Sequence, residues 1–328
     1  MADKSRTTRR MVLKQVTAIG MGIVGGSAGL AAGRRTGMTE TTKGTWHTPV
    51  TESDILGVHD DVAHRFRNDF GESVRLPIQP TMVEGQQLVA YGITVEADET
   101  MEMYYGFVSD SDSAAQTAAR HRAVERFGAT SSSSSGDNCD SDNFDRWAGK
   151  FTEAGGCGDG GVVTLDSEIY VHSNDHSVWA MASNAGVIPG ENECKDSYSE
   201  SVWSQASHDW DYSFADNPVI KDRDPTGTKD GETSYTITAE VNTTGGAASV
   251  STTYSQPDVY FESNGSSTTT QLDWEYTNSS NDTTWDVEYL SACEYREKPG
   301  RHDTLGLDRF TTKYTGGKVK ASNGFVFR

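Results

Sequence analysis

Basic residues are scarce in this sequence. Its 328 residues include 28 Lys and Arg against 48 Asp and Glu, a formal net charge of −20. Phosphate binding needs a basic footprint, so this balance argues against nucleic acid as a partner. The same charge opposes a compact state in ordinary saline, whereas at molar salt the screening length falls to about 3 Å and the repulsion largely disappears.

The sequence also lacks the short motifs of several enzyme classes. It has no H-E-x-x-H zinc motif, no P-loop, and no C-x-x-C pair among its four cysteines. After the N-terminal segment, no stretch approaches the ~18 apolar residues that a membrane-spanning helix needs. We therefore expect no transmembrane segment in the mature chain.

A charged run is the most informative feature near the N-terminus. Thr8-Arg9-Arg10-Met11-Val12-Leu13-Lys14 precedes an uncharged, Gly- and Ala-rich segment from Val16 to Ala32. The arrangement resembles a twin-arginine (Tat) export signal, with Arg9 and Arg10 as its arginines and Val12 in place of the commoner Phe. The resemblance implies export by the Tat translocase, removal of residues 1–33 as a signal peptide, and a secreted product.

The same apolar segment imitates two catalytic motifs. Residues 20–25 match a dinucleotide-binding G-x-G-x-x-G, and residues 25–29 match the G-x-S-x-G nucleophile elbow. A dinucleotide site would need a second strand to close a βαβ unit, but the residues that follow are rich in Gly and Thr. Small-residue composition alone produces such matches, so we interpret the segment as a signal.

Acidity, few large aliphatic residues and the Tat signal together resemble secreted proteins of haloarchaea. Residues 1–33 hold five basic residues and one acidic residue, which leaves 23 basic and 47 acidic residues, or −24, in the mature chain. The resemblance implies a protein that folds in molar salt. An acidic secreted protein of another prokaryote is the alternative.

Four cysteines in an exported chain favour two disulfides. Three connectivities exist, and we favour a short Cys139–Cys157 loop together with Cys194–Cys293, which would join distant strands. A zinc site built from all four cysteines is the alternative, and the absence of C-x-x-C spacing argues against it.

Composition divides the mature chain into a lead, two domains and a linker. Residues 34–50 predict a flexible lead, and residues 51–128 predict a small α+β domain with a helix at about 54–70. Two strands at about 86–96 and 101–109 and a second helix at 114–127 complete this domain. The Ser- and Asp-rich residues 129–143 predict a linker.

From residue 144 to residue 328 the hydrophobic period becomes two. Leu272, Trp274 and Tyr276 alternate with polar residues, and several neighbouring segments behave in the same way. One apolar face and one polar face predict antiparallel sheets that are each covered on one side. We therefore predict a mainly β protein whose residues 144–328 form an antiparallel β-sandwich, with Cys293 facing the core; a jelly roll or a sandwich split in two would give the same pattern.

Two groups of residues are candidate modification or metal sites. Asn242, Asn264, Asn278 and Asn281 begin N-x-Ser/Thr sequons at predicted turns, where a glycan would be accessible. Residues 222–230 place oxygen ligands at positions 1, 3, 5 and 9 of a calcium-type loop, but the bidentate Glu at position 12 is missing. We expect a polar turn and no cofactor there, with calcium as the alternative; the loop's oxygen-bearing residues are Asp222, Asp224, Thr226 and Asp230.

No residue is assigned a catalytic role. His172 and His176 could bind a metal ion with Asp175, but they flank a predicted turn. Ser207-His208-Asp209 has the composition of a catalytic triad, yet adjacent residues of an extended chain point to opposite faces and cannot adopt that geometry.

Three function classes stay open. The first is a secreted or cell-surface glycoprotein that acts as a binding or interaction module on an extracellular partner. The second is a secreted antimicrobial protein that resembles halocins in export signal, acidity and size only. The third is an extracellular hydrolase that acts on carbohydrate through Asp and Glu in a sandwich cleft.

Overall fold

The computed structural model describes residues between Met38 and Val326, with several gaps. The chain divides into residues 1–35 and residues 36–328, and every described residue belongs to the second unit. The described residues are 38–74, 76, 85–109, 113–127, 140–190, 200–210, 218–226, 228–229, 233–243, 246–256, 259–264, 271–278, 284–296 and 304–326.

Strands dominate the described part of the chain. They are β1 (Met38–Lys43), β2 (Gln87–Val95), β3 (Met101–Val108), β4 (Asp140–Asp142), β5 (Phe144–Gly156), β6 (Gly161–His172), β7 (Asp175–Pro189), β8 (Ser201–Asp209), β9 (Val219–Asp224), β10 (Thr228–Lys229), β11 (Thr233–Thr243), β12 (Gly246–Gln256), β13 (Val259–Asn264), β14 (Gln271–Asn278), β15 (Trp285–Glu294), β16 (Thr304–Tyr314) and β17 (Lys318–Val326). The helices are α1 (Glu52–Phe70), α2 (Ser113–Phe127) and the short 3-10 helix η1 (Cys157–Asp159). The predicted mainly β class is confirmed.

The strands form three sheets. The large sheet has the order β1-β2-β3-β5-β6-β7-β15-β9, the six-stranded sheet β10-β13-β14-β8-β16-β17, and the three-stranded sheet β11-β12-β4. Among the described strands, pairing is antiparallel except between β3 and β5, which run parallel and are joined through α2.

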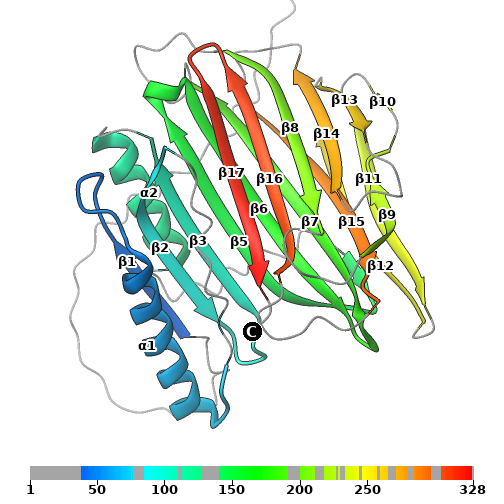
Figure 1. The fold of residues 1–328 in the computed structure, drawn as a ribbon, viewed down its shortest axis with the longest axis horizontal. Coiled ribbons are helices and arrows are strands. Elements are labelled where there is room, and N and C mark those ends of the chain that lie inside the picture. Colours follow the sequence, from blue (N-terminus) through cyan, green and yellow to red (C-terminus); the bar gives the residue numbers. More distant parts are fainter. Residues whose placement is uncertain are drawn as a thin grey trace, which may run out of the picture. The chain divides into compact units, whose positions relative to one another are not determined.

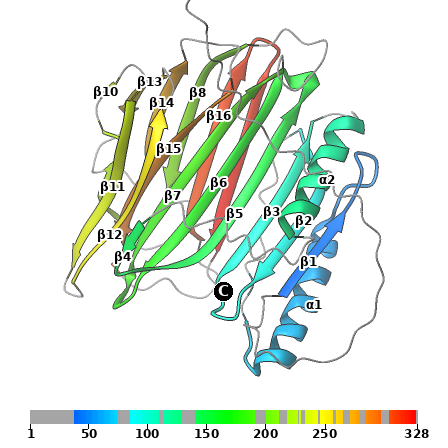
Figure 2. The same cartoon turned by 180° about the vertical axis from the view of Figure 1, so that it is seen from behind.

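The large sheet is covered on both faces (Figures 1 and 2). The six-stranded sheet packs on one face, where Trp179 and Tyr289 of the large sheet share a core with Trp274 and Phe310. Helix α1 lies on the same face over the other end of the sheet. The three-stranded sheet packs on the opposite face, and α2 covers that face near β2 and β3. The predicted antiparallel sandwich is thus extended to a third β layer.

Local sequence explains the predicted first helix. The Thr51 side chain accepts from the Asp54 backbone N–H while the Asp54 carboxylate accepts from the Thr51 backbone N–H, which satisfies the helix start. Gly71 ends the helix with φ of 80°, a left-handed conformation that glycine adopts without strain. Ile55, Val62 and Phe66 are buried on one face, as their spacing predicts.

Strands from both predicted domains lie in the same sheet. Residues 36–328 form one compact unit because β2 and β3 continue the same large sheet as β5, β6 and β7. Residues 140–142, placed in the predicted linker, form β4 and pair with β12. Residues 38–43, placed in the predicted flexible lead, form β1 and pair with β2. Within the described residues, no helix has the length and apolar character to span a membrane.

Candidate functional site

The solvent face of the six-stranded sheet carries lysines on β16 and β17, a tryptophan on β8, and acidic residues on β8 and β14 (Asp209, Asp273 and Glu275). Along β8, β16 and β17, Ala206, Phe310 and Ala321 point into the core, so the alternate side chains point outward. Among the outward residues of these strands that are half-buried or exposed, Asp209 pairs with Arg309, and we call the others the basic face: Trp203, Gln205, Arg309, Thr311, Lys313, Lys318 and Lys320.

Strand register brings the basic residues together. Lys313 of β16 lies directly opposite Lys318 of β17 on one side and Trp203 of β8 on the other. One step along the strands, Thr311 lies between Lys320 and Gln205. The Lys318 Nζ sits 5.3 Å from the centre of the Trp203 ring, within reach of a cation–π attraction.

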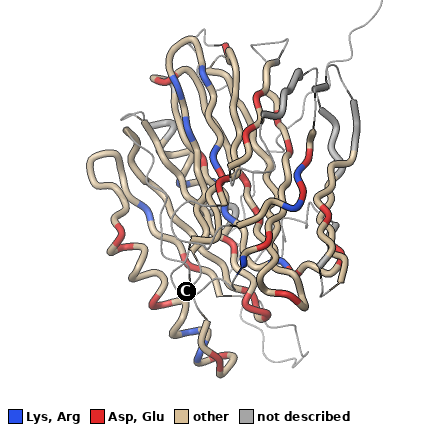
Figure 3. Tube along the Cα trace, turned by 45° about the vertical axis from the view of Figure 1, so that its right-hand side comes forward, with Lys and Arg blue, Asp and Glu red and all other residues tan. Residues whose placement is uncertain are grey.

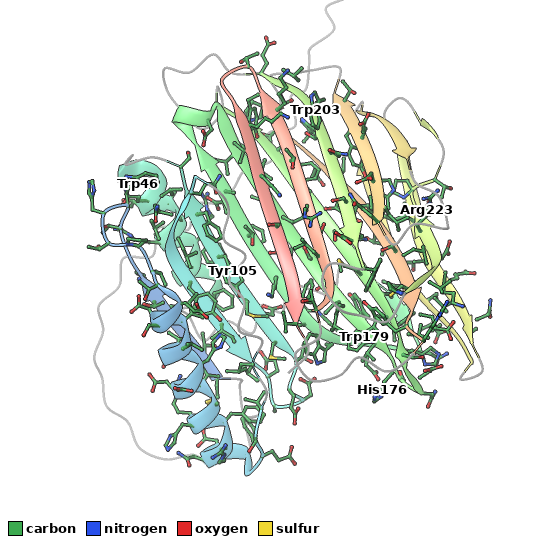
Figure 4. All side chains as sticks on the ribbon, viewed as in Figure 1. Trp46, Tyr105, His176, Trp179, Trp203 and Arg223 are labelled. Carbon is green, nitrogen blue, oxygen red and sulfur yellow. The ribbon has the colours of Figure 1, made fainter. Side chains whose placement is uncertain are left out.

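The electrostatics of this face differ from those of the rest of the chain. Like charges directly opposite each other on neighbouring strands are destabilising, yet Lys313 faces Lys318 and β17 contains no acidic residue. Within the described part of the chain, neither Lys313 nor Lys318 forms a salt bridge, whereas Arg309 contacts Asp209 at 3.4 Å. Figure 3 shows the Lys and Arg positions among the more numerous Asp and Glu positions, and Figure 4 labels Trp203.

A second polar group lies inside the sandwich, between the large and six-stranded sheets. Asp308 Oδ2 accepts from Ser167 Oγ at 2.5 Å and from Ser183 Oγ at 2.6 Å, and Asp308 Oδ1 accepts from Tyr289 OH at 2.8 Å. His208 Nε2 lies 2.9 Å from Ser183 Oγ. The structure thus gathers a Ser, a His and an Asp from β7, β8 and β16, strands that are far apart in the sequence, rather than from residues 207–209.

The hydrogen bonds of His208 oppose a catalytic role. Because the Ser183 hydroxyl donates to Asp308, His208 Nε2 must donate to Ser183, which leaves Nδ1 to accept from Ser291 Oγ at 2.6 Å. A triad needs the reverse, with Nε2 accepting the serine proton. Burial lowers the pKa of His208 to about 3, and the side chains of His208 and Asp308 are fully buried. This network therefore has no access to a substrate.

The opposite face of the large sheet has an acidic pocket. Burial raises the pKa of Glu288, despite hydrogen bonds from Thr252 and Asn184, and also raises that of the neighbouring Asp286. The cavity is about 20 Å³, enough for about one water molecule and too small for a sugar ring. Within the described residues, no group of three or more His, Cys, Asp or Glu is arranged to hold a metal ion. The pocket is lined by Asp166, Glu168, Ala182, Ser183, Asn184, Thr252 and Glu288.

The candidate calcium residues have backbone partners. Asp222 and Asp224 lie on β9, where their carboxylates accept the backbone N–H groups of Glu240 at 2.7 Å and of Thr238 at 3.0 Å. They thereby attach the three-stranded sheet to the edge of the large sheet. Thr226 is exposed, and Asp230 lies outside the described residues. Calcium binding at this segment stays an untested prediction.

The cysteine predictions have different outcomes. Cys293 is buried on the apolar side of β15, as its position predicts. Its thiol is free in the structure. Cys139 and Cys194 lie outside the described residues, and of Cys157 only the backbone in η1 is described. The Cys139–Cys157 and Cys194–Cys293 bridges therefore both stay predictions.

The remaining predicted sites are only partly described. Asn242 is exposed near the end of β11, while Asn264 and Asn278 are the last residues of β13 and β14. Asn281, Arg9 and Arg10 lie outside the described residues.

The predicted turn between His172 and His176 is present. The Nδ1 atom of the buried His172 accepts from the backbone N–H groups of Asn174 and Asp175 at 3.0 and 3.1 Å. That nitrogen is therefore used in the turn between β6 and β7 rather than offered to a metal ion.

Comparisons with known proteins add little to this geometry. The sequence matches no protein family, and a comparison with curated proteins gives no match. Among solved structures, the chain is similar to the Clostridium perfringens NetB toxin in its membrane inserted form, with a TM-score of 0.27 and 8% identity over 57% of this chain and 95% of that chain. A likeness this weak establishes neither the fold nor the function of this chain.

Proposed function

We propose that this protein is a secreted binding protein of high-salt surroundings that holds its partner on the basic face. The observation that carries the proposal is the register of β8, β16 and β17, which sets Lys313 between Lys318 and Trp203 on a solvent-facing sheet. Opposed lysines reduce stability, so their presence in an acid-rich chain is better explained by binding than by folding.

Binding is favoured over hydrolysis by what surrounds the reactive groups. The Ser–His–Asp group is sealed in the core, with His208 in the wrong tautomer for a base. The acidic pocket has room for about one water molecule. An exposed sheet face needs neither a cleft nor an activated nucleophile to retain a partner.

Export and modification complete the proposal. The Tat-like residues Arg9 and Arg10 support secretion, the formal charge of −20 supports function in molar salt, and the sequons support a glycoprotein. A spot assay against related strains separates this proposal from the antimicrobial alternative, because growth inhibition is expected only of an antagonist.

The test uses the mature protein recovered from high-salt culture supernatant. Wild type, Lys318→Glu and Lys43→Glu are compared for binding to a glycan array and to cell-envelope fractions in molar salt. Lys43 is an exposed strand lysine outside the basic face, so its variant carries the same change in net charge. We expect Lys318→Glu to lose binding and Lys43→Glu to retain it. Equal binding by all three proteins, or no binding by wild type, would contradict the proposal.

A further inference from the structure

We propose that Lys150 and Asn323 react with each other inside the folded protein and form an isopeptide bond between their side chains. Lys150 lies on β5 of the large sheet, and Asn323 lies on β17 of the six-stranded sheet. The bond therefore joins the two layers of the sandwich covalently. This modification is independent of the binding proposed for the basic face.

Strand register stacks the two residues face to face. Lys150 pairs with Ser167 across β5 and β6, and β17 passes over these strands (Figure 1). The Asn323 Nδ2 donates to the Lys150 backbone carbonyl at 3.0 Å, and the Lys150 Nζ donates to the backbone carbonyl of Gly324, the residue after Asn323. The amine thus lies next to the Asn323 backbone, and its flexible four-carbon stem lets it turn toward the side-chain carbon Cγ.

The surroundings of Lys150 favour a neutral, nucleophilic amine. The residue is 1% exposed, and its Nζ lies 5.5 Å from the centre of the Tyr105 ring and 5.4 Å from that of the Phe325 ring. Burial lowers the pKa of the amine to about 7, so about half of the molecules hold it uncharged at pH 7. Keeping a buried lysine charged is costly, whereas the amide that it forms carries no charge.

The Asn323 amide has a polar partner at each atom that changes in the reaction. Thr152 Oγ1 donates to Asn323 Oδ1 at 2.5 Å, where negative charge develops as the amine attacks. Ser167 Oγ lies 2.7 Å from the leaving Nδ2 and 2.5 Å from Asp308 Oδ2. Burial raises the pKa of Asp308 to about 6, so its protonated form can pass a proton through Ser167 to the leaving nitrogen. These four residues are fully buried, which keeps competing water away.

The reaction balances without a cofactor or an oxidant. The Nζ lone pair attacks Asn323 Cγ, and the Nζ–Cγ bond forms while the carbonyl π electrons move to Oδ1. As those electrons return, the Cγ–Nδ2 bond breaks, Nζ loses one proton, and the leaving nitrogen gains one and departs as ammonia. The product is a secondary amide that ties β5 to β17. Such a bond limits the freedom of the unfolded chain and, unlike an exposed ion pair, is not screened by molar salt.

The experiment is peptide mapping of the mature protein recovered from high-salt culture supernatant, after reduction and trypsin digestion. Residues 321–328 form one tryptic peptide, and blocked cleavage at Lys150 leaves residues 147–195 as another; neither contains an N-x-Ser/Thr sequon, so glycans do not alter their masses. We expect one branched peptide that is lighter than the sum of the two by about 17 Da, the mass of ammonia. Fragmentation should place the branch at Lys150 and Asn323.

Variants test the roles of the reacting groups. Lys150→Met removes both the nucleophile and the buried charge, and it should release an unmodified 321–328 peptide. Lys43→Met, at an exposed lysine outside the site, should leave that peptide linked. Asp308→Asn should lower the linked fraction because it removes the proton source. Circular dichroism checks that each variant is folded, and the wild-type map decides the proposal even if a variant is not.

Three outcomes would overturn the proposal. The first is an unmodified 321–328 peptide together with cleavage after Lys150 in folded wild type. The second is a linear 321–328 peptide that is lighter by about 17 Da, because Asn323 precedes Gly324 and can lose ammonia to its own backbone as a succinimide. The third is a branched peptide that persists in Lys150→Met.

Discussion

Replacing Asp308 by Asn should change how the stability of this protein depends on pH. The Asp308 side chain is fully buried, and burial raises its pKa from 3.8 to about 6 although the hydrogen bonds from Ser167, Ser183 and Tyr289 lower it. The folded state therefore takes up a proton at a higher pH than the unfolded chain. The resulting stabilisation is complete below pH 3.8 and is lost as the pH rises through 6.

The size of the effect follows from the two pKa values. With values of about 6 in the folded state and 3.8 in the unfolded state, protonation of Asp308 stabilises the fold by about 1.4 kcal/mol at pH 5 relative to pH 8, and by about 3 kcal/mol at the acidic limit. His208, whose Nε2 lies 3.8 Å from Asp308 Oδ1, acts in the opposite direction, because burial lowers its pKa to about 3. His208 is present in both proteins, so its contribution largely cancels in their difference.

The assay is denaturant unfolding of wild type and Asp308→Asn at pH 5, 6, 7 and 8, all at one salt concentration. Asn retains the shape of Asp and one carbonyl acceptor, so the variant should fold. The stability of wild type relative to the variant should rise by about 1.4 kcal/mol from pH 8 to pH 5. Asp60→Asn on the exposed side of α1 controls for the loss of one surface charge. If the curves of wild type and Asp308→Asn run parallel, burial does not perturb Asp308 and the reasoning is wrong.

Three further predictions concern stability. Dialysis of the mature protein from molar salt to about 0.1 M should unfold it, because charge repulsion is no longer screened, and its circular dichroism spectrum should change to that of an unfolded chain; an unchanged spectrum would contradict the halophilic assignment. Gly161→Ala should lower the free energy of unfolding by about 1–3 kcal/mol, because the new Cβ would lie 2.6 Å from Ile188 O and from the Tyr314 ring. Gly57→Ala in α1, where a Cβ would have no atom within 4 Å, should leave the protein as stable or more stable, and thermal unfolding of both variants checks this. Thr51→Ala should destabilise by about 1 kcal/mol through loss of the helix cap, and Thr51→Ser should restore most of it.

Local patterns predicted most elements of the fold but not their pairing. The helical spacing of Ile55, Val62 and Phe66 and the alternation around Trp274 each reflect a face that one element buries. Strand β1 was missed because its residues, MTETTK, have no apolar alternation, and pairing with β2 makes it a strand. The parallel contact of β3 with β5 crosses the segment whose composition predicts a linker. Composition indicates whether a segment is exposed to solvent, but it does not indicate which strands pair on either side of that segment, because that pairing depends on the whole sheet.

The basic face had a weak signal in the sequence. Lys318 and Lys320 alternate with Val319 and Ala321, which predicts a strand with one solvated side and nothing more specific. Only the register of β16 with β17 places Lys313 opposite Lys318. The same register with β8 adds Trp203, more than 100 residues earlier in the chain.

The buried network could not be recognised as a motif because its members meet only when two sheets stack. Ser183 and Tyr289 come from the large sheet, whereas His208 and Asp308 come from the six-stranded sheet. Each serine or acid replaces an apolar residue at an inward position, and nothing local indicates its partner. A slip of one residue in either sheet would turn these polar groups outward or leave them buried without partners, at about 1–3 kcal/mol for each unsatisfied group. The residues that resemble a catalytic triad therefore favour this stacking of the two sheets over stackings shifted by one residue. In this stacking the alternate side chains of β8 and β16, which belong to the basic face, point toward solvent.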